Sequence, residues 1–177
     1  APSKRILNFK LVGSAEQKNN YQINYTPLLG WNNYNKFMPG MAFYNISVPT
    51  KKLEYFVMPL LSTGHNTQLL SGSAKVAYRF YPSEIFREIK FSSQIKSYNS
   101  PIEPFNEVGS FINFQNGVSA EFKKQEFKSN WLHKLFATVT YIDESPIDED
   151  QIDQSLYQLN YQNTYTTIGY NVAHKNV

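Results

Sequence analysis

The sequence contains no cysteine, and none of its apolar runs approaches the roughly 20 residues that a membrane-spanning helix needs. The absence of cysteine excludes a disulfide framework, a thiol nucleophile and a cysteine-ligated zinc site. Charged residues are scarce at 18%, whereas Tyr, Phe and Asn are abundant, with 13, 13 and 18 copies among 177 residues. A chain of this length is expected to be one domain. Abundant aromatic and uncharged polar side chains favour strands over helices.

Motifs that carry catalytic chemistry are also missing. The sequence has no His-Glu-x-x-His zinc helix, no Gly-x-Ser-x-Gly nucleophile elbow, no phosphate loop and no dinucleotide fingerprint. An acidic segment from Asp143 to Asp153 could bind calcium, but it lacks the EF-hand pattern and is interpreted as a solvated loop. We therefore expect no catalytic residue, no metal ligand and no cofactor in this chain. Whether a larger parent protein is an enzyme stays open.

The formal net charge of +3 raises the question of a nucleic-acid partner. The basic residues are spread over many segments, however, and they do not alternate with aromatic residues on a shared face. We therefore expect no binding to nucleic acid.

Apolar residues recur at every second position through most of the chain, which is the spacing of a strand. Val76 and Tyr78, for example, alternate with Lys75 and Arg79. The pattern and its breaks predict an all-β chain of about ten strands in an antiparallel up-and-down meander. The expected strands are 5–12, 20–29, 40–48, 53–61, 72–81, 88–98, 110–123, 131–142, 156–162 and 164–174. A hairpin signal at Asn116-Gly117 is set aside, because the apolar phase continues through it.

The expected connections alternate in length. Those at 30–39, 62–71, 99–109 and 143–155 are long, and those at 49–52, 82–87, 124–130 and 163 are short. In an antiparallel meander this alternation places short turns at one end and long loops at the other, as in outer-membrane barrels. The expected strand lengths also lie near the 9 to 11 residues that span a bilayer.

The two faces of the expected strands differ in character. One face is apolar, and its aromatic residues gather near the short turns, which suggests an interfacial girdle in a membrane barrel. The predicted girdle is Tyr44, Tyr55, Phe80, Tyr81, Phe122, Trp131, Tyr161 and Tyr165. The other face is polar and must be wet, because burying unpaired charges is costly. Its basic residues outnumber its acidic ones and predict a cationic lumen lined by Lys10, Lys75, Arg79, Lys90, Lys96 and Lys134.

A family resemblance begins at Tyr25. Residues 25–40 read YTPLLGWNNYNKFMPG and are followed by Ala42-Phe43-Tyr44-Asn45, Leu53-Glu54-Tyr55 and Met58-Pro59. This stretch resembles the C-terminal outer-membrane β-barrel region of Bacteroidota surface proteins whose N-terminal part is a gluzincin-type zinc aminopeptidase-like domain. The resemblance implies an outer-membrane anchor attached to a metallopeptidase, and none of that family's zinc ligands has a counterpart here.

These observations lead to a prediction with two alternatives. Residues 1–177 are expected to form a single β-barrel-like domain, part of a larger protein, that serves as a non-catalytic membrane anchor or pore wall in the outer membrane. Its partners would be the lipid bilayer and the remainder of the parent polypeptide. The first alternative is a soluble β-barrel or sandwich that binds a small apolar ligand on an inward-facing aromatic surface. The second is a barrel-borne hydrolase whose catalytic residues meet only on folding.

Overall fold

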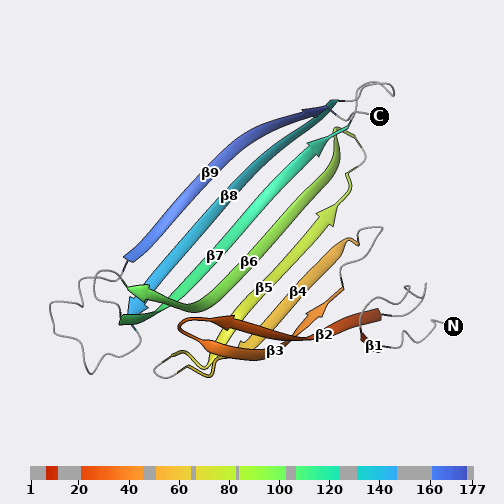
Figure 1. The fold of residues 1–177 in the computed structure, drawn as a ribbon. Coiled ribbons are helices and arrows are strands. Elements are labelled where there is room, and N and C mark those ends of the chain that lie inside the picture. Colours follow the sequence, from red (N-terminus) through yellow and green to blue (C-terminus); the bar gives the residue numbers. More distant parts are fainter. Residues whose placement is uncertain are drawn as a thin grey trace.

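The computed structural model describes residues 7–11, 21–45, 51–64, 67–82, 84–102, 107–123, 131–146 and 161–174, which form one nine-stranded sheet and no helix. The strands are β1 (Leu7–Leu11), β2 (Tyr21–Asn32), β3 (Lys36–Tyr44), β4 (Leu53–Leu61), β5 (Leu70–Phe80), β6 (Phe86–Ile102), β7 (Glu107–Phe122), β8 (Trp131–Pro146) and β9 (Tyr161–His174). From β2 to β9 each strand pairs antiparallel with the next (Figure 1). The predicted all-β meander is confirmed in this part of the chain. Within it, β1 and β9 are edges that do not pair with each other.

The strand count differs from the expected ten because the predicted turn at Asn163 does not exist. Asn163 lies inside β9 and pairs with Ile142 of β8. A hairpin connection needs at least two residues, and the β-forming residues that follow Asn163 extend the ladder instead. The Asn116-Gly117 pair is likewise inside a strand, so the expectation of an unbroken β7 is confirmed.

The predicted alternation of long and short connections is wrong. The expected long loop at 30–39 is a tight turn over residues 33–35, because the Oδ1 of Asn32 accepts the N–H groups of Tyr34 at 2.9 Å and Asn35 at 2.6 Å. Lys36 then takes a positive φ of 56°, as the last residue of a short hairpin loop often does. The intervals between the other antiparallel strands that the structure describes are 45–52, 62–69, 81–85, 103–106, 123–130 and 147–160, and at neither end of the sheet are they all short.

Two further details correct the expected meander. First, β1 pairs with β2 in parallel, a register that keeps Asn8 beside Gln22 and Phe9 beside Ile23 and so preserves the two-residue alternation. Second, β3 has the opposite phase to the one expected, because Tyr44 lies opposite Asn24 on the polar face. The next residue, Asn45, donates its N–H to the carbonyl of Tyr55 at 3.2 Å. Its side chain donates to the carbonyl of Leu53 at 2.9 Å and accepts the N–H of Tyr55 at 2.7 Å.

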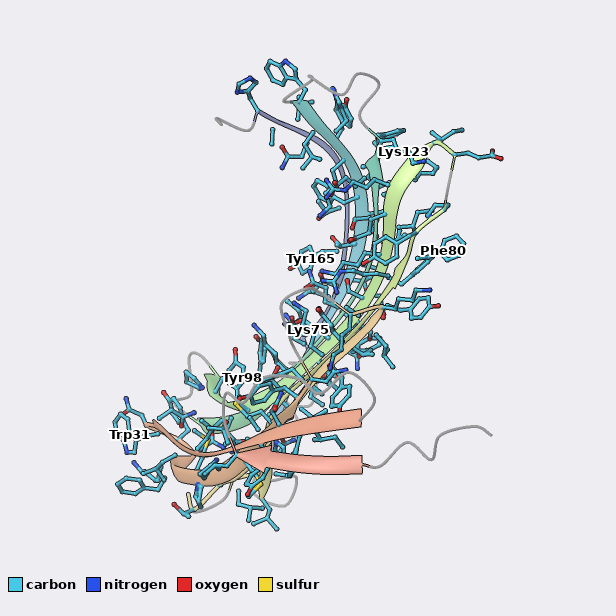
Figure 2. The ribbon with its side chains drawn as sticks, turned by 90° about the vertical axis from the view of Figure 1, so that its right-hand side faces the viewer. Trp31, Lys75, Phe80, Tyr98, Lys123 and Tyr165 are labelled. Atoms are coloured by element: carbon cyan, nitrogen blue, oxygen red, sulfur yellow. The ribbon has the colours of Figure 1, made fainter. Side chains whose placement is uncertain are left out.

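The sheet is bowed as well as twisted. Figure 2 views it along its edge and shows Phe80 on the outer side of the bow, with Lys75 and Tyr165 on the inner side. The register agrees, since Lys75 and Tyr165 share a row of cross-strand neighbours, whereas Phe80 belongs to the opposite face. The concave side is therefore the polar face and the convex side is the apolar face.

Candidate functional site

The apolar face is the convex face, and its large side chains are exposed. The exposed fraction is 79% for Ile168, 47% for Tyr78 and 45% for Val139. No second layer of described residues covers them. Its exposed large members are Leu29, Trp31, Phe37, Leu53, Val57, Leu61, Leu70, Val76, Tyr78, Phe80, Phe91, Ile95, Phe114, Val118, Trp131, Leu135, Val139, Ile168, Tyr170 and Val172. A continuous apolar surface of this kind marks contact with lipid or with another chain.

The polar face is the concave face, and it is the more sheltered of the two. The buried strand residues among those described are Met38, Ala42, Leu60, Ser71, Ala77, Asn99 and Gly109, and all but Asn99 lie on this face. A soluble sheet would bury its apolar face and expose its polar face. Here no second layer of described residues covers either face, and the apolar face is the more exposed of the two.

Five of the six residues predicted to line a cationic lumen have described side chains, and all five lie on the polar face. Arg79 and Lys90 are direct cross-strand neighbours, Lys96 is opposite Ser73, and Lys134 is opposite Glu121. The fifth is Lys75, opposite Gln94. The sixth, Lys10, lies in β1 beside Asn24, and its side chain is outside the described part of the chain.

Arg79 differs from the four lysines because acidic residues neutralise it. Its Nη1 lies 2.7 Å from Glu54 Oε2, and its Nε lies 3.4 Å from Glu88 Oε1. The side chains of Arg79 and Glu54 are only 11% and 13% exposed. Among the described residues, none of the lysines at positions 75, 90, 96 and 134 forms an ion pair. The unpaired positive charge on this face therefore comes from the lysines. The contribution of Glu88 was not predicted.

The predicted girdle residues separate into two groups. Phe80, Tyr81, Phe122 and Trp131 lie near one rim of the sheet, beside connections 81–85 and 123–130. The rings of Phe86 and Phe122 are 5.0 Å apart there, and those of Trp131 and His174 are 4.9 Å apart.

The other predicted girdle residues are placed differently. Tyr55 is on the apolar face of β4. Tyr44 and Tyr165 lie on the polar face, where an interfacial girdle would not include them, and the hydroxyl of Tyr44 is 3.3 Å from Thr26 Oγ1. Tyr161 begins β9, and its side chain is outside the described part.

A buried hydrogen-bond cluster centred on Asn35 was not predicted. Asn35 is 0% exposed, and its Nδ2 donates to Ser62 Oγ at 2.9 Å and to Ser71 Oγ at 2.8 Å. Its Oδ1 accepts from Asn32 Nδ2 at 2.9 Å and from the N–H of Asn99 at 3.1 Å. The cluster joins the β2–β3 turn, the connection at 62–69 and β6. The Asn-rich stretch 32–35 indicates a turn, but nothing local to it indicates partners this distant.

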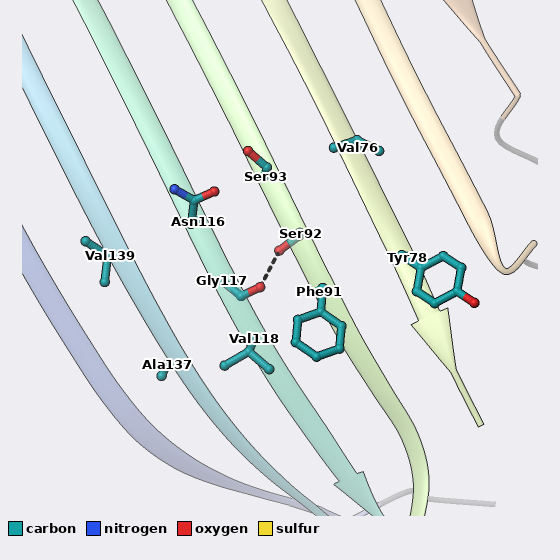
Figure 3. A pocket seen from close by; sticks show the side chains of 10 residues that line it. All are labelled: Val76, Tyr78, Phe91, Ser92, Ser93, Asn116, Gly117, Val118, Ala137 and Val139. Atoms are coloured by element: carbon teal, nitrogen blue, oxygen red, sulfur yellow. Dashed lines mark hydrogen bonds between the residues drawn. The ribbon is translucent and has the colours of Figure 1, made fainter. Parts of the chain in front are cut away.

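A second unpredicted feature is a hollow of about 450 Å³ on the apolar face (Figure 3). Ser93 and Asn116, which are cross-strand neighbours, line one end of it. The small side chain of Ala137 leaves room between the larger Val118 and Val139. Neither polar side chain forms a hydrogen bond with another described residue. Strand periodicity alone could have located them as polar interruptions of an apolar face.

The described residues include no helix long and apolar enough to cross a membrane and no group of acidic or histidine side chains able to hold a metal ion. No protein-family model, curated protein or solved structure significantly matches the chain.

Proposed function

We propose that this chain forms part of the wall of an outer-membrane β-barrel and serves as a membrane anchor or pore wall without catalysing a reaction. The observation that carries this proposal is the distribution of its side chains between the two faces. Exposed Phe91 and Val139 belong to the convex apolar face, and the lysines belong to the concave polar face. Lipid around such a wall would cover the apolar side chains, and enclosed water would solvate the lysines.

The exposed edges of the sheet support a barrel that is completed by further strands of the same polypeptide. β9 is a long edge strand, and an unpaired edge of this length invites association with other chains. Closure into a barrel removes edges altogether. We propose that the remainder of a larger polypeptide supplies the missing strands. The resemblance of residues 25–59 to Bacteroidota peptidase-associated barrels supports a metallopeptidase as that parent.

Spin labelling tests the proposed orientation of the two faces, and the absence of cysteine makes it clean because each introduced Cys is unique. Leu135 and Lys134 are adjacent in β8 but lie on opposite faces. In vesicles, a label at Leu135→Cys should be relaxed mainly by oxygen, and one at Lys134→Cys mainly by a water-soluble nickel chelate. Equal relaxation of both labels by the nickel chelate, or a monodisperse chain in buffer without detergent, would favour the soluble alternative.

A pore function has its own test. An open lumen lined by Lys75, Lys90, Lys96 and Lys134 would attract anions. Planar-bilayer recordings should therefore show a reversal potential that indicates anion selectivity under a salt gradient. Replacing the four lysines with Gln should abolish that selectivity while leaving heat-modifiable gel mobility unchanged. Conductance without ion preference in the unmodified chain would contradict the cationic lumen, and absence of conductance would restrict the proposal to an anchor.

A further inference from the structure

The Ser93–Asn116 pair lies in surroundings that do not suit it if the apolar face touches lipid. Along the strands, Ser93 lies between Phe91 and Ile95, and Asn116 lies between Phe114 and Val118. Across the strands, the pair is flanked by Val76 and Val139. Six apolar side chains therefore surround two polar ones, and the described residues offer neither of the two a side-chain hydrogen-bond partner.

The bilayer makes such a pair informative. Hydrocarbon offers no hydrogen bonds, so an exposed primary amide there loses the partners that water would supply. Apolar side chains gain little from meeting another protein in lipid, because acyl chains contact them equally well. Polar side chains and small residues that allow close approach therefore decide where membrane proteins meet. The hollow combines both features, because the polar Ser93 and Asn116 line it together with the small Ala137.

We propose that this hollow is the contact between two copies of this chain in the membrane, with Asn116 of each copy hydrogen-bonded to Asn116 or Ser93 of the other. The inference rests on the proposed membrane function. A primary amide carries both donors and an acceptor, so a two-fold axis through the hollow gives reciprocal bonds from a single residue type. An acyl chain offers no such bonds, and a lipid headgroup is an unsuitable occupant because apolar side chains surround the pair on every side.

Energy transfer between donor-labelled and acceptor-labelled copies in vesicles tests the contact at several protein-to-lipid ratios. We expect association of the unmodified chain and about a tenfold weaker association constant for Asn116→Val, which keeps the strand and removes the amide. Asn113→Val is the matched control, because Asn113 is the same residue type in the same strand but lies on the polar face. It should change the association constant less than twofold.

Cross-linking through single cysteines provides a second measurement that leaves the polar pair intact. Val139→Cys places a thiol beside Asn116, and Thr138→Cys places one on the opposite face. Oxidation in vesicles should give a disulfide-linked dimer for Val139→Cys and none for Thr138→Cys.

The outcomes separate the two proposals. Vesicle insertion without energy transfer, transfer that Asn116→Val leaves unchanged, or equal cross-linking at both cysteines would overturn the proposed contact and leave the barrel proposal standing. Binding of a different membrane protein at the hollow, with this chain itself monomeric, would overturn it too. Failure of the complete parent polypeptide that carries this chain to insert into vesicles would overturn both.

Discussion

Two parts of the sheet, strands β2–β5 and strands β8 and β9, are held together in different ways. Strands β2–β5 are joined by side-chain interactions in addition to their backbone ladder, including the Asn35 cluster and the sheltered Arg79–Glu54 ion pair. Among the described residues of β8 and β9, by contrast, no side chain is buried, and the contacts that supplement their backbone ladder, such as His133–Tyr170 and Trp131–His174, lie on the exposed apolar face. Strands β2–β5 therefore carry their own tertiary contacts. Strands β8 and β9 depend more on what surrounds them, which is expected of a barrel wall between lipid and water.

The largest effect should come from replacing Asn35, the centre of the hydrogen-bond cluster in strands β2–β5. Asn35→Ala deletes four side-chain hydrogen bonds and leaves the hydroxyl groups of Ser62 and Ser71 and the N–H of Asn99 without that partner. We expect a loss of about 4 kcal/mol in the free energy of unfolding, measured by urea titration in vesicles. Asn33→Ala, at an exposed position in the same turn, should cost less than about 0.5 kcal/mol. Equal losses would show that the cluster contributes no particular stability.

A substitution on β9 tests whether strands β8 and β9 depend on lipid for their stability. Ile168→Lys places a charge on the apolar face, and in vesicles it should cost about 3 kcal/mol of unfolding free energy. Thr167→Lys places the same charge on the polar face and should cost less than about 0.5 kcal/mol. If Thr167→Lys proved the more damaging of the two, the assignment of the faces would be reversed.

Two ion pairs, Arg79–Glu54 and Arg87–Glu121, sharpen the comparison at intermediate energy. Arg79→Met leaves Glu54 sheltered without its cation, and we expect it to cost about 2 kcal/mol. Arg87 is 57% exposed, so Arg87→Met should break its 2.9 Å contact with Glu121 for less than about 1 kcal/mol. Adding Glu54→Gln to Arg79→Met should restore part of the loss in the same urea titration. No restoration would mean that the cost comes from lost packing of the arginine stem.

The sequence predicted the faces far better than the ends of the strands. A two-residue alternation is local, so Lys75, Arg79 and Lys134 could be assigned to one face without knowledge of their neighbours. The Asn35 cluster could not be predicted, because Asn99 is 64 positions away and meets Asn35 only in the folded sheet. The predicted phase of β3 was wrong for a related reason. Asn45 continues the strand pattern of the sequence, but its side chain hydrogen-bonds to the backbone of Leu53 and Tyr55 in β4.

Another small effect is expected at Gly169 on the exposed β9 edge. A Cβ at this position would lie 2.3 Å from Phe136 Cζ, because the ring from β8 covers the glycine. The ring is the far end of a side chain and can swing away, so Gly169→Ala should cost only about 1 kcal/mol in the urea titration. Combined with Phe136→Leu, the same substitution should cost nearly nothing more, because the overlap is gone. If Gly169→Ala cost as much unfolding free energy in the double variant as alone, the strain would lie in the backbone of β9. Strands β8 and β9 would then have a structural constraint beyond their backbone ladder.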